Sequence, residues 1–190
     1  MPPRMKFSKE EIVAAALELT RKQGFGAVTA RDVGTALGVS SRPVYTAFSN
    51  MTELKGAVFA AAAQCFEAYC REYTAKATGP KYKALGEAYI GFAREEGELF
   101  TLLFMSDHTD IPCAETVDLG FSQGVSLVGL ATGADIEEAM RLHTEIWIFV
   151  HGIATMIVTS TQRWSAEQIS RMTSDVYAAL VAKQEKGEIG

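Results

Sequence analysis

The residues of this chain best suited to hydrogen-bond another macromolecule form a polar run at positions 40–46, SSRPVYT. Arg42 carries a planar guanidinium that can donate two parallel hydrogen bonds, and the major-groove edge of guanine accepts this geometry. Pro43 offers only apolar contact, for example to a thymine methyl group. Hydroxyl groups come from the other members of the run, Ser40, Ser41, Tyr45 and Thr46. We predict that Arg42 reads a base; contact with a phosphate, or plain solvation, is the alternative.

Two short helices around a glycine turn are expected to position this run. Apolar residues recur at helical spacing over 33–37, and Gly38 then ends the first helix, because glycine tolerates the positive φ of a sharp turn. The two serines after the turn can cap the second helix, and Val44 and Phe48 form its buried face. The residues left to face outward or to lie near that face are Ser41, Arg42, Pro43, Tyr45, Thr46 and Ala47. This arrangement is a helix-turn-helix, whose second helix lies in a DNA major groove.

The surrounding stretch, residues 24–54, resembles the DNA-binding domain of the tetracycline-repressor (TetR) family. It reads GFGAVTARDVGTALGVSSRPVYTAFSNMTEL. Three elements carry the resemblance in order: a Gly-aromatic pair before a Thr-capped helix, a Gly-Val-Ser turn, and a Tyr-x-x-Phe that closes the second helix. A bare helix-turn-helix is only moderately specific, but these elements together over about thirty residues are strongly so.

The resemblance implies roles for individual residues. Thr29 caps the first helix, whose start meets a DNA phosphate, and the Tyr45 hydroxyl contacts another. Family members commonly place a Lys at the position of Met51, so we expect Lys55, one turn later, to replace that phosphate contact in part. Gly34 stands where the family usually has Ala, and we expect a close crossing of the two helices there.

The charge of the chain is distributed unevenly. The formal net charge is −5. Residues 1–56 nevertheless hold eight Lys and Arg against five Asp and Glu, a net of +3, and residues 57–190 hold ten against eighteen, a net of −8. The basic end coincides with the helix-turn-helix. It would be attracted to phosphates while the acidic remainder would be repelled.

The fold class expected is all-α, with about nine helices in two domains. Residues 1–56 are expected to form a three-helix DNA-binding domain, opened by a capping box at Ser8. Residues 57–190 are expected to form a helical ligand-binding and dimerisation domain. Further helices are predicted at 9–22, 53–73, 82–94, 99–105, 114–128, 135–159 and from 165 onward, with Thr52, Asp135 and Ser165 as caps of their helices.

Aromatic side chains are unusually frequent in the second domain and fall on several of its predicted helices. An apolar cavity with a few polar groups is what a small-molecule site requires. The alternative is that these side chains simply fill a solid core, with the imidazole of His151 hydrogen-bonded inside it. The candidate ligand-binding residues are Phe66, Tyr69, Tyr89, Phe92, Phe104, Trp147 and His151.

Two segments of this domain extend the resemblance over nearly the whole chain. FAREEGELFTLLF, at 92–104, is similar to a segment of one TetR subgroup, and WIFVHG, at 147–152, matches its Trp-x-x-x-His-Gly signature. In the family the last two helices of two subunits pack as a four-helix bundle. The resemblance therefore implies a homodimer formed through the last two helices.

The sequence argues against several other classes. We find no Gly-rich phosphate loop, no His-Glu-x-x-His zinc motif and no Glu-x-x-His pair, and therefore expect neither an enzyme nor a cofactor. His108, between two loop aspartates, is expected to be solvated rather than to bind a metal. Cys65, Cys70 and Cys113 are expected to be buried thiols. The absence of an apolar run of 18 residues and of a signal-peptide pattern predicts a cytoplasmic protein without a membrane span.

These observations predict a ligand-responsive DNA-binding transcriptional regulator. We expect a repressor that binds a palindromic operator as a homodimer and is released by a small, mostly apolar inducer. The alternative is an all-helical small-molecule carrier or adaptor without specific DNA binding, which a DNA-binding measurement on the purified protein would distinguish.

Overall fold

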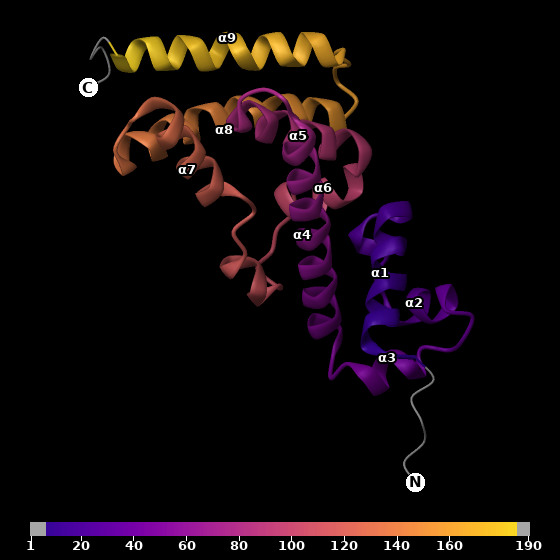
Figure 1. Ribbon diagram of the computed structural model, residues 1–190. Coiled ribbons are helices and arrows are strands. Elements are labelled where there is room, and N and C mark those ends of the chain that lie inside the picture. The colour runs from indigo at the N-terminus through magenta and orange to yellow at the C-terminus, as the bar shows by residue number, and fades with distance from the viewer. Residues whose placement is uncertain (1–6, 186–190) are drawn as a thin grey trace. The chain divides into compact units, whose positions relative to one another are not determined.

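The computed structural model describes the backbone of residues 7–185, and the side chains in that range apart from 112–113 and 184–185. Nine α-helices and two 3₁₀ turns make up the described part, which holds no strand, so the predicted all-α class is confirmed (Figure 1). The elements are α1 Lys9–Gln23, η1 Phe25–Ala27, α2 Ala30–Ala36, α3 Arg42–Ala47, α4 Met51–Lys76, α5 Lys81–Glu95, α6 Gly97–Phe104, η2 Pro112–Thr116, α7 Phe121–Thr132, α8 Ile136–Val158 and α9 Ala166–Glu185.

The described residues pack into two units, each with its own internal contacts. Unit 1 takes the residues up to 66 together with 96–117, and unit 2 takes 67–95 together with the residues from 118 onward. The long helix α4 contributes to both units. The domain boundary predicted at 56/57 stays a prediction, because unit 1 is assembled from two stretches of chain and follows no single boundary.

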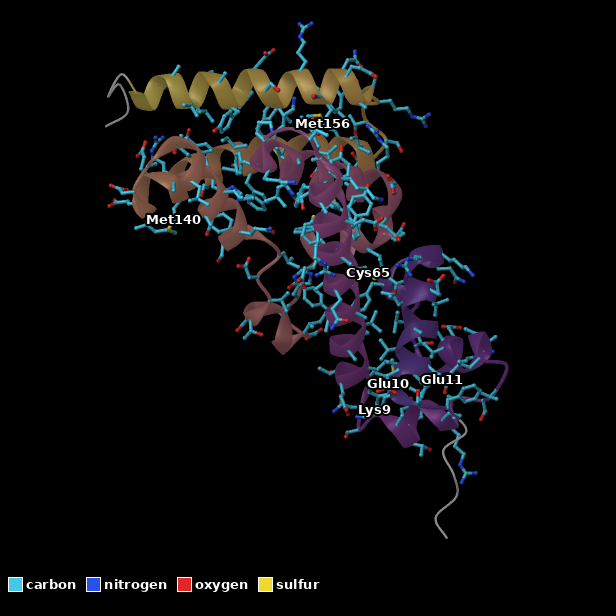
Figure 2. The ribbon with its side chains drawn as sticks, viewed as in Figure 1. Lys9, Glu10, Glu11, Cys65, Met140 and Met156 are labelled. Atoms are coloured by element: carbon cyan, nitrogen blue, oxygen red, sulfur yellow. The ribbon has the colours of Figure 1, made fainter. Side chains whose placement is uncertain are left out.

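Unit 1 places α1 against α2 and α6. The predicted capping box at Ser8 is confirmed: its hydroxyl accepts from the Glu11 amide at 3.1 Å, and its own amide donates to the Glu11 carboxylate at 2.7 Å. Ile12 and Ala16 are fully buried on the inner side of α1. At the other end of α1, the Arg21 guanidinium lies 2.9 Å from Glu96, which precedes α6. It also lies 3.5 Å from the sulfur of Cys65, which is labelled on α4 in Figure 2.

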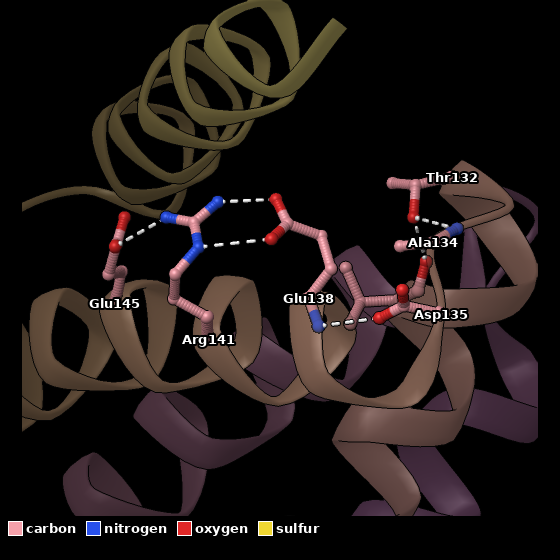
Figure 3. A network of polar contacts seen from close by, with 7 residues as sticks. Thr132, Ala134, Asp135, Glu138, Arg141 and Glu145 are labelled. Atoms are coloured by element: carbon pink, nitrogen blue, oxygen red, sulfur yellow. Dashed lines mark hydrogen bonds and ion pairs between the residues drawn. The ribbon is translucent and has the colours of Figure 1, made fainter. Parts of the chain in front are cut away.

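Unit 2 is built on α5, α7, α8 and α9, and α8 lies beside α9 (Figure 1). The cap predicted at Asp135 is confirmed, because its carboxylate accepts from the Glu138 amide at 3.0 Å (Figure 3). One turn further on, Arg141 joins Glu138 to Glu145, with its Nη1 2.8 Å from the Glu145 carboxylate. The cap at Ser165 is also confirmed, since its hydroxyl accepts from the Gln168 amide at 3.2 Å. Local capping chemistry therefore sets the starts of both long C-terminal helices.

Two helix starts differ from the sequence prediction. The helix predicted over 114–128 begins only at Phe121, because the carboxylate of Asp118 accepts from the Phe121 and Ser122 amides and caps it there. Helix α4 is capped by Asn50, whose side chain accepts from the Glu53 amide at 2.8 Å, and not by Thr52, which lies inside the helix. In both cases an Asp or Asn side chain accepts hydrogen bonds from the free amides at the helix start. Asp118 sets the start of α7 later than predicted, and Asn50 caps α4 two residues before Thr52.

No helix in the described range is long and apolar enough to cross a lipid bilayer.

Candidate nucleic-acid interface and ligand site

The turn between α2 and α3 is closed by backbone geometry that favours glycine. Gly38 adopts φ +70°, the left-handed region in which a Cβ is unfavourable. Its amide donates to the Thr35 carbonyl at 3.0 Å, and the next amide, of Val39, donates to the Gly34 carbonyl at 2.9 Å. These bonds satisfy the last carbonyls of α2 and turn the chain sharply toward α3.

The close helix crossing expected at Gly34 is confirmed. A Cβ on Gly34 would lie 2.7 Å from both the carbonyl carbon and the oxygen of Ser40. Backbone atoms cannot withdraw as the end of a flexible side chain can, so this position excludes every other residue without a shift of the turn. The approach of α2 to the start of α3 is therefore closer than the alanine usual in related sequences would permit.

Helix α3 presents the predicted polar side chains outward. Arg42, Thr46 and Tyr45 are exposed, Tyr45 by 61 %. Among the described residues the guanidinium of Arg42 has no hydrogen-bond or ion-pair partner, whereas the Thr46 hydroxyl donates to the Arg42 carbonyl at 2.9 Å. The remaining predicted contacts sit at the edge of this face: Ser40 is exposed, and Ser41 and Pro43 are half-buried.

The inner side of α3 differs from the prediction at one residue. Val44 and Phe48 are buried as expected, but Ala47 is also buried, at 8 % exposure, and does not belong to the outward face. Of the two serines expected to cap α3, only Ser40 accepts a hydrogen bond, a long one of 3.5 Å from the Arg42 amide; Ser41 makes no capping bond. Ala47 was misplaced because its small side chain gives no hydrophobic signal of its own.

A cap and an ion pair within unit 1 lie at the start of α2 and just past the end of α3. The predicted cap Thr29 is confirmed, since its hydroxyl accepts from the Asp32 amide at 3.1 Å and starts α2. Past the other end, Lys9 of α1 lies over the Phe48 ring at 5.0 Å and bonds Glu53 of α4 at 2.7 Å. This hydrogen bond, with a second from the Ser49 amide, lowers the pKa of Glu53 to about 2.

Lys55, predicted to contact phosphate, lies one turn into α4 and is half-buried. Its ammonium lies 5.7 Å from the centre of the Phe25 ring, so Lys55 makes a cation–π interaction inside unit 1. Met51, where related proteins have Lys, is half-buried at that start.

In unit 2, three of the predicted ligand-binding residues form one cluster. The Tyr89 hydroxyl is 2.8 Å from Nδ1 of His151, and the Trp147 ring stacks on the imidazole with centroids 5.3 Å apart. Burial raises the pKa of Tyr89 and lowers the pKa of His151, so both groups are neutral near pH 7. The hydrogen-bonded imidazole considered from the sequence is present, and it is also the polar centre of an aromatic cluster.

A second pair of the same kind lies two helical turns away. The Tyr82 hydroxyl is 2.9 Å from Nδ1 of His143, which is 6 % exposed. Because Tyr82 and Tyr89 of α5 meet His143 and His151 of α8 in the same order, the two helices run in the same direction here. The sequence reasoning missed Tyr82 and His143, although the repeated two-turn spacing of Tyr and His could have revealed them.

The other predicted ligand-binding residues fall into two pairs. In unit 2 the Tyr69 ring meets Phe92 with centroids 5.6 Å apart, and its hydroxyl donates to the Glu95 carboxylate at 2.9 Å. In unit 1 the Phe66 ring meets Phe104 edge to face at 5.1 Å. The structure therefore gathers the seven residues into three groups, of which the cluster at Tyr89 combines aromatic surface with a buried polar centre.

The loop histidine is not solvated, contrary to the prediction. His108 is half-buried, with Nε2 2.5 Å from the Leu102 carbonyl and its ring against Phe59. Over the described residues, no three His, Cys, Asp or Glu side chains are grouped to hold a metal ion. Burial raises the pKa of the Cys70 thiol to about 12, and Cys65 is half-buried, while the side chain of Cys113 lies outside the described residues.

The chain matches two family descriptions that together span both units. Residues 12–58 match "Bacterial regulatory proteins, tetR family", and residues 82–181 match "Tetracyclin repressor-like, C-terminal domain". A comparison with curated proteins gives no match. Neither matching family is a catalytic one.

Solved structures share this fold at low sequence identity. A protein of Pseudomonas aeruginosa PAO1 assigned as a transcriptional regulator has a TM-score of 0.73 at 14% identity, over 95% of each chain. The fatty acid degradation regulator FadR of Bacillus halodurans has a TM-score of 0.63 at 15% identity, over 91% of this chain and 94% of its own. AibR, in complex with isovaleryl coenzyme A and operator DNA, has a TM-score of 0.60 at 14% identity, over 89% of this chain and 97% of its own.

The C-terminal match alone covers more than half of the chain, and the N-terminal match covers the turn that holds Arg42 outward. This protein belongs to the TetR family of bacterial regulatory proteins.

Proposed function

We propose that this protein is a ligand-responsive transcriptional repressor that binds a palindromic operator as a homodimer in the bacterial cytoplasm. The observation that carries the proposal is the outward face of α3, where an exposed, unpaired Arg42 and the exposed Tyr45 stand on a helix fixed by α1, α2 and α4. A short helix held in this way can enter a major groove without reorganising.

Within this proposal the face divides into base reading and phosphate contact. Arg42 donates to the O6 and N7 atoms of a guanine, and Pro43 offers apolar contact beside it. The hydroxyl of Tyr45 and the amides at the start of α2, behind Thr29, bind phosphates. Ser40, Ser41, Thr46 and Lys55 add donors at the edge of the same face.

A single helix-turn-helix contacts too few base pairs to select one genomic site, so the operator must be bound by two copies. The stripe Ile148, Gly152 and Met156, spaced by four residues on α8, supplies the pairing surface. Ile148 is 61 % exposed and Met156 is 44 % exposed, and a Cβ on Gly152 would meet nothing within 4 Å (Figure 2 labels Met156). This face of α8 is therefore not covered by α9 and can pack against the equivalent face of a second subunit.

The aromatic cluster of Tyr89, Trp147 and His151 is the proposed effector site, with Tyr69 and Phe92, also in unit 2, as its further apolar lining. Because these polar groups are neutral and the rings are large, the effector is a mostly apolar molecule. It must bind the DNA-incompetent state more tightly than the DNA-binding state, since equal affinity would shift nothing. AibR, similar in fold, has been seen with both a small molecule and operator DNA. We also propose that residues 57–190 belong to the TetR subgroup with the Trp-x-x-x-His-Gly signature.

The test is selection of genomic fragments by the purified full-length protein, followed by quantitative binding to the enriched site. We expect enrichment of fragments that share a two-fold symmetric site, bound by a dimer. When Arg42→Ala replaces the wild type in the selection, the enriched site should lose its preference at one base position of each half-site. If the wild type enriched no sequence and bound DNA no better than an acidic protein of its charge, the alternative of a small-molecule carrier or adaptor would replace this proposal.

A further inference from the structure

One buried nitrogen in unit 2 has no hydrogen-bond partner. His143 is 6 % exposed and uses Nδ1 for Tyr82, but its Nε2 is enclosed and bonds to nothing in the described part of the chain. An unsatisfied buried polar atom costs about as much as a hydrogen bond contributes. Such atoms are rare in folded proteins and call for a partner from outside the chain or a functional reason.

The surroundings of this nitrogen are aromatic. The Phe121 ring meets the imidazole edge to face with centroids 4.7 Å apart, and Tyr82 meets it from α5 at 5.8 Å. Phe121 in turn lies 6.5 Å from Trp147, which joins His143 to the cluster at Tyr89. A molecule that reaches Nε2 therefore lies against ring faces and edges, which favours an apolar molecule that itself contains a ring.

The charge around the imidazole selects the polar group of that molecule. Burial lowers the pKa of His143, and the carboxylate of Asp118 raises it by a smaller effect, so the ring is neutral at pH 7. A neutral ring beside a carboxylate does not attract an anion. If Tyr82 donates to Nδ1, Nε2 carries the proton and donates; if Tyr82 accepts, Nε2 is an acceptor. A hydroxyl group can satisfy either tautomer.

Helix α7 covers Nε2 and must move for a molecule to reach it. The imidazole edge lies directly against Gly124, and a Cβ on this residue would collide with the ring. Glycines in the left-handed conformation stand at both ends of α7, Gly120 with φ +88° and Gly133 with φ +73°. Inside α7 the buried residues are Gly124, Val125 and Val128, so the part of the helix over the imidazole is small.

We propose that α7 is a movable cover and that His143 is the hydroxyl-binding residue of the effector site: a neutral, ring-containing molecule displaces α7 from the imidazole and hydrogen-bonds to Nε2 through a hydroxyl. This inference deepens the proposed function, because it names the chemical class of the effector. It needs no DNA to be tested, so failure of operator binding and failure of this site give separate results.

The probes are 4-ethylphenol and ethylbenzene, which differ by one hydroxyl. The chain contains three histidines, so the imidazole nitrogens of the full-length protein, labelled with ¹⁵N-histidine, give three ring systems that single variants assign. We expect 4-ethylphenol to move the Nε2 resonance of His143 and to bind roughly 3- to 10-fold more tightly than ethylbenzene. Ethylbenzene should leave that resonance in place.

Two variants separate hydrogen bonding from packing. His143→Asn places an amide where Nδ1 stood, within reach of Tyr82, and removes Nε2; the two probes should then bind equally. His108→Asn, in unit 1, is the matched control and should keep the preference for the phenol. The proposal is overturned if 4-ethylphenol binds without moving the Nε2 resonance, if the wild type binds both probes equally, or if neither probe binds up to its solubility limit. The wild-type spectra decide even if His143→Asn does not fold.

Discussion

The recognition face on α3 and the aromatic cluster of unit 2 are built in opposite ways. The face is made by residues within one short stretch, from Thr29 to Phe48, with Gly34 and Gly38 setting the turn. The cluster is made by two cross-helix pairs, Tyr82 with His143 and Tyr89 with His151, which are 61 and 62 positions apart. A local site is fixed by capping and turn chemistry, whereas a long-range site depends on how whole helices pack.

Each region also uses a glycine to bring two elements into contact, but the neighbour differs. At Gly34 the neighbour is the backbone of Ser40, and at Gly124 it is the side chain of His143. A backbone contact is rigid, because moving it moves the turn. A side-chain contact can be relieved by rotation. The DNA-binding face is thus suited to keep one shape, and the cluster is suited to adopt two.

The largest effect is expected from a substitution in unit 2 that destroys DNA binding without touching α3. Ile148→Glu puts a charge on the proposed pairing face of α8, where burial against a second subunit would leave that charge unpaired. We expect monomers in analytical ultracentrifugation and loss of operator binding together. Leu130→Glu, on α7 and 84 % exposed, is the matched control and should leave both unchanged. A wild type that is already monomeric at micromolar concentration would refute the pairing face.

A methyl group at Gly34 should destabilise unit 1 through its backbone contact. The collision with the Ser40 backbone costs about 1–3 kcal/mol, against about 1 kcal/mol gained from better helix propensity. We expect a net decrease in the free energy of unfolding, and faster amide exchange in α2 and α3. Gly86→Ala in α5, where the nearest atom to the new Cβ is 3.7 Å away, should instead be neutral or stabilising. Equal behaviour of the two variants would show that the crossing at Gly34 is not tight.

The same change at Gly124 should act on a side-chain contact instead of a backbone contact. Rotation of the His143 ring can relieve the collision with the new methyl group, but it breaks the buried hydrogen bond to Tyr82. That loss costs about 1–3 kcal/mol, offset in part by about 1 kcal/mol of helix propensity. Because both tryptophans of the chain, Trp147 and Trp164, belong to unit 2, their fluorescence follows its unfolding directly. A loss larger than that at Gly34 would reverse the contrast between the rigid and the adaptable contact.

The two histidines of unit 2 predict that its stability depends on pH, with no such dependence expected from the α3 face. Burial lowers the pKa of His143 and of His151 below 6.5 in the folded protein. As the pH falls below about 6.5, the unfolded chain therefore takes up protons on these rings before the folded protein does, and stability is lost by up to about 1.4 kcal/mol per pH unit for each ring. Denaturant titrations between about pH 5 and 7, a window that brackets the ordinary histidine pKa, should show that the free energy of unfolding falls as the pH falls. The slope should be smaller in His143→Asn. A slope unchanged by that variant would mean that His143 does not contribute.

Most of the helix caps and the sharp turn could be predicted from the sequence, because they are decided by short-range chemistry. The caps at Ser8, Thr29, Asp135 and Ser165, and the turn at Gly38, each depend on residues within four positions. The start of α7 was misplaced because Asp118 competes for the free amides of that helix. Such competition is invisible to hydrophobic periodicity.

Long-range contacts limited the prediction of the candidate sites. His143 fell on the apolar stripe of its helix, and the pattern alone does not say that Tyr82 meets it. Ala47 was placed outward because nothing near it in sequence shows that α3 is so closely packed. The polar face of α3 was identified correctly in its main members, Arg42, Tyr45 and Thr46, since a six-residue helix with two buried apolar residues leaves few other orientations.

The central claim, that α3 reads DNA sequence, is tested most directly by the affinity of Arg42→Ala for its selected operator and for unrelated DNA. We predict a loss of roughly 1–3 kcal/mol confined to one base position of each half-site, with unrelated DNA bound almost as before. Tyr45→Phe, which removes a proposed phosphate contact, should weaken both DNAs about equally. If Arg42→Ala weakened the operator and unrelated DNA to the same extent, Arg42 would be a phosphate contact and the account of sequence recognition would be wrong.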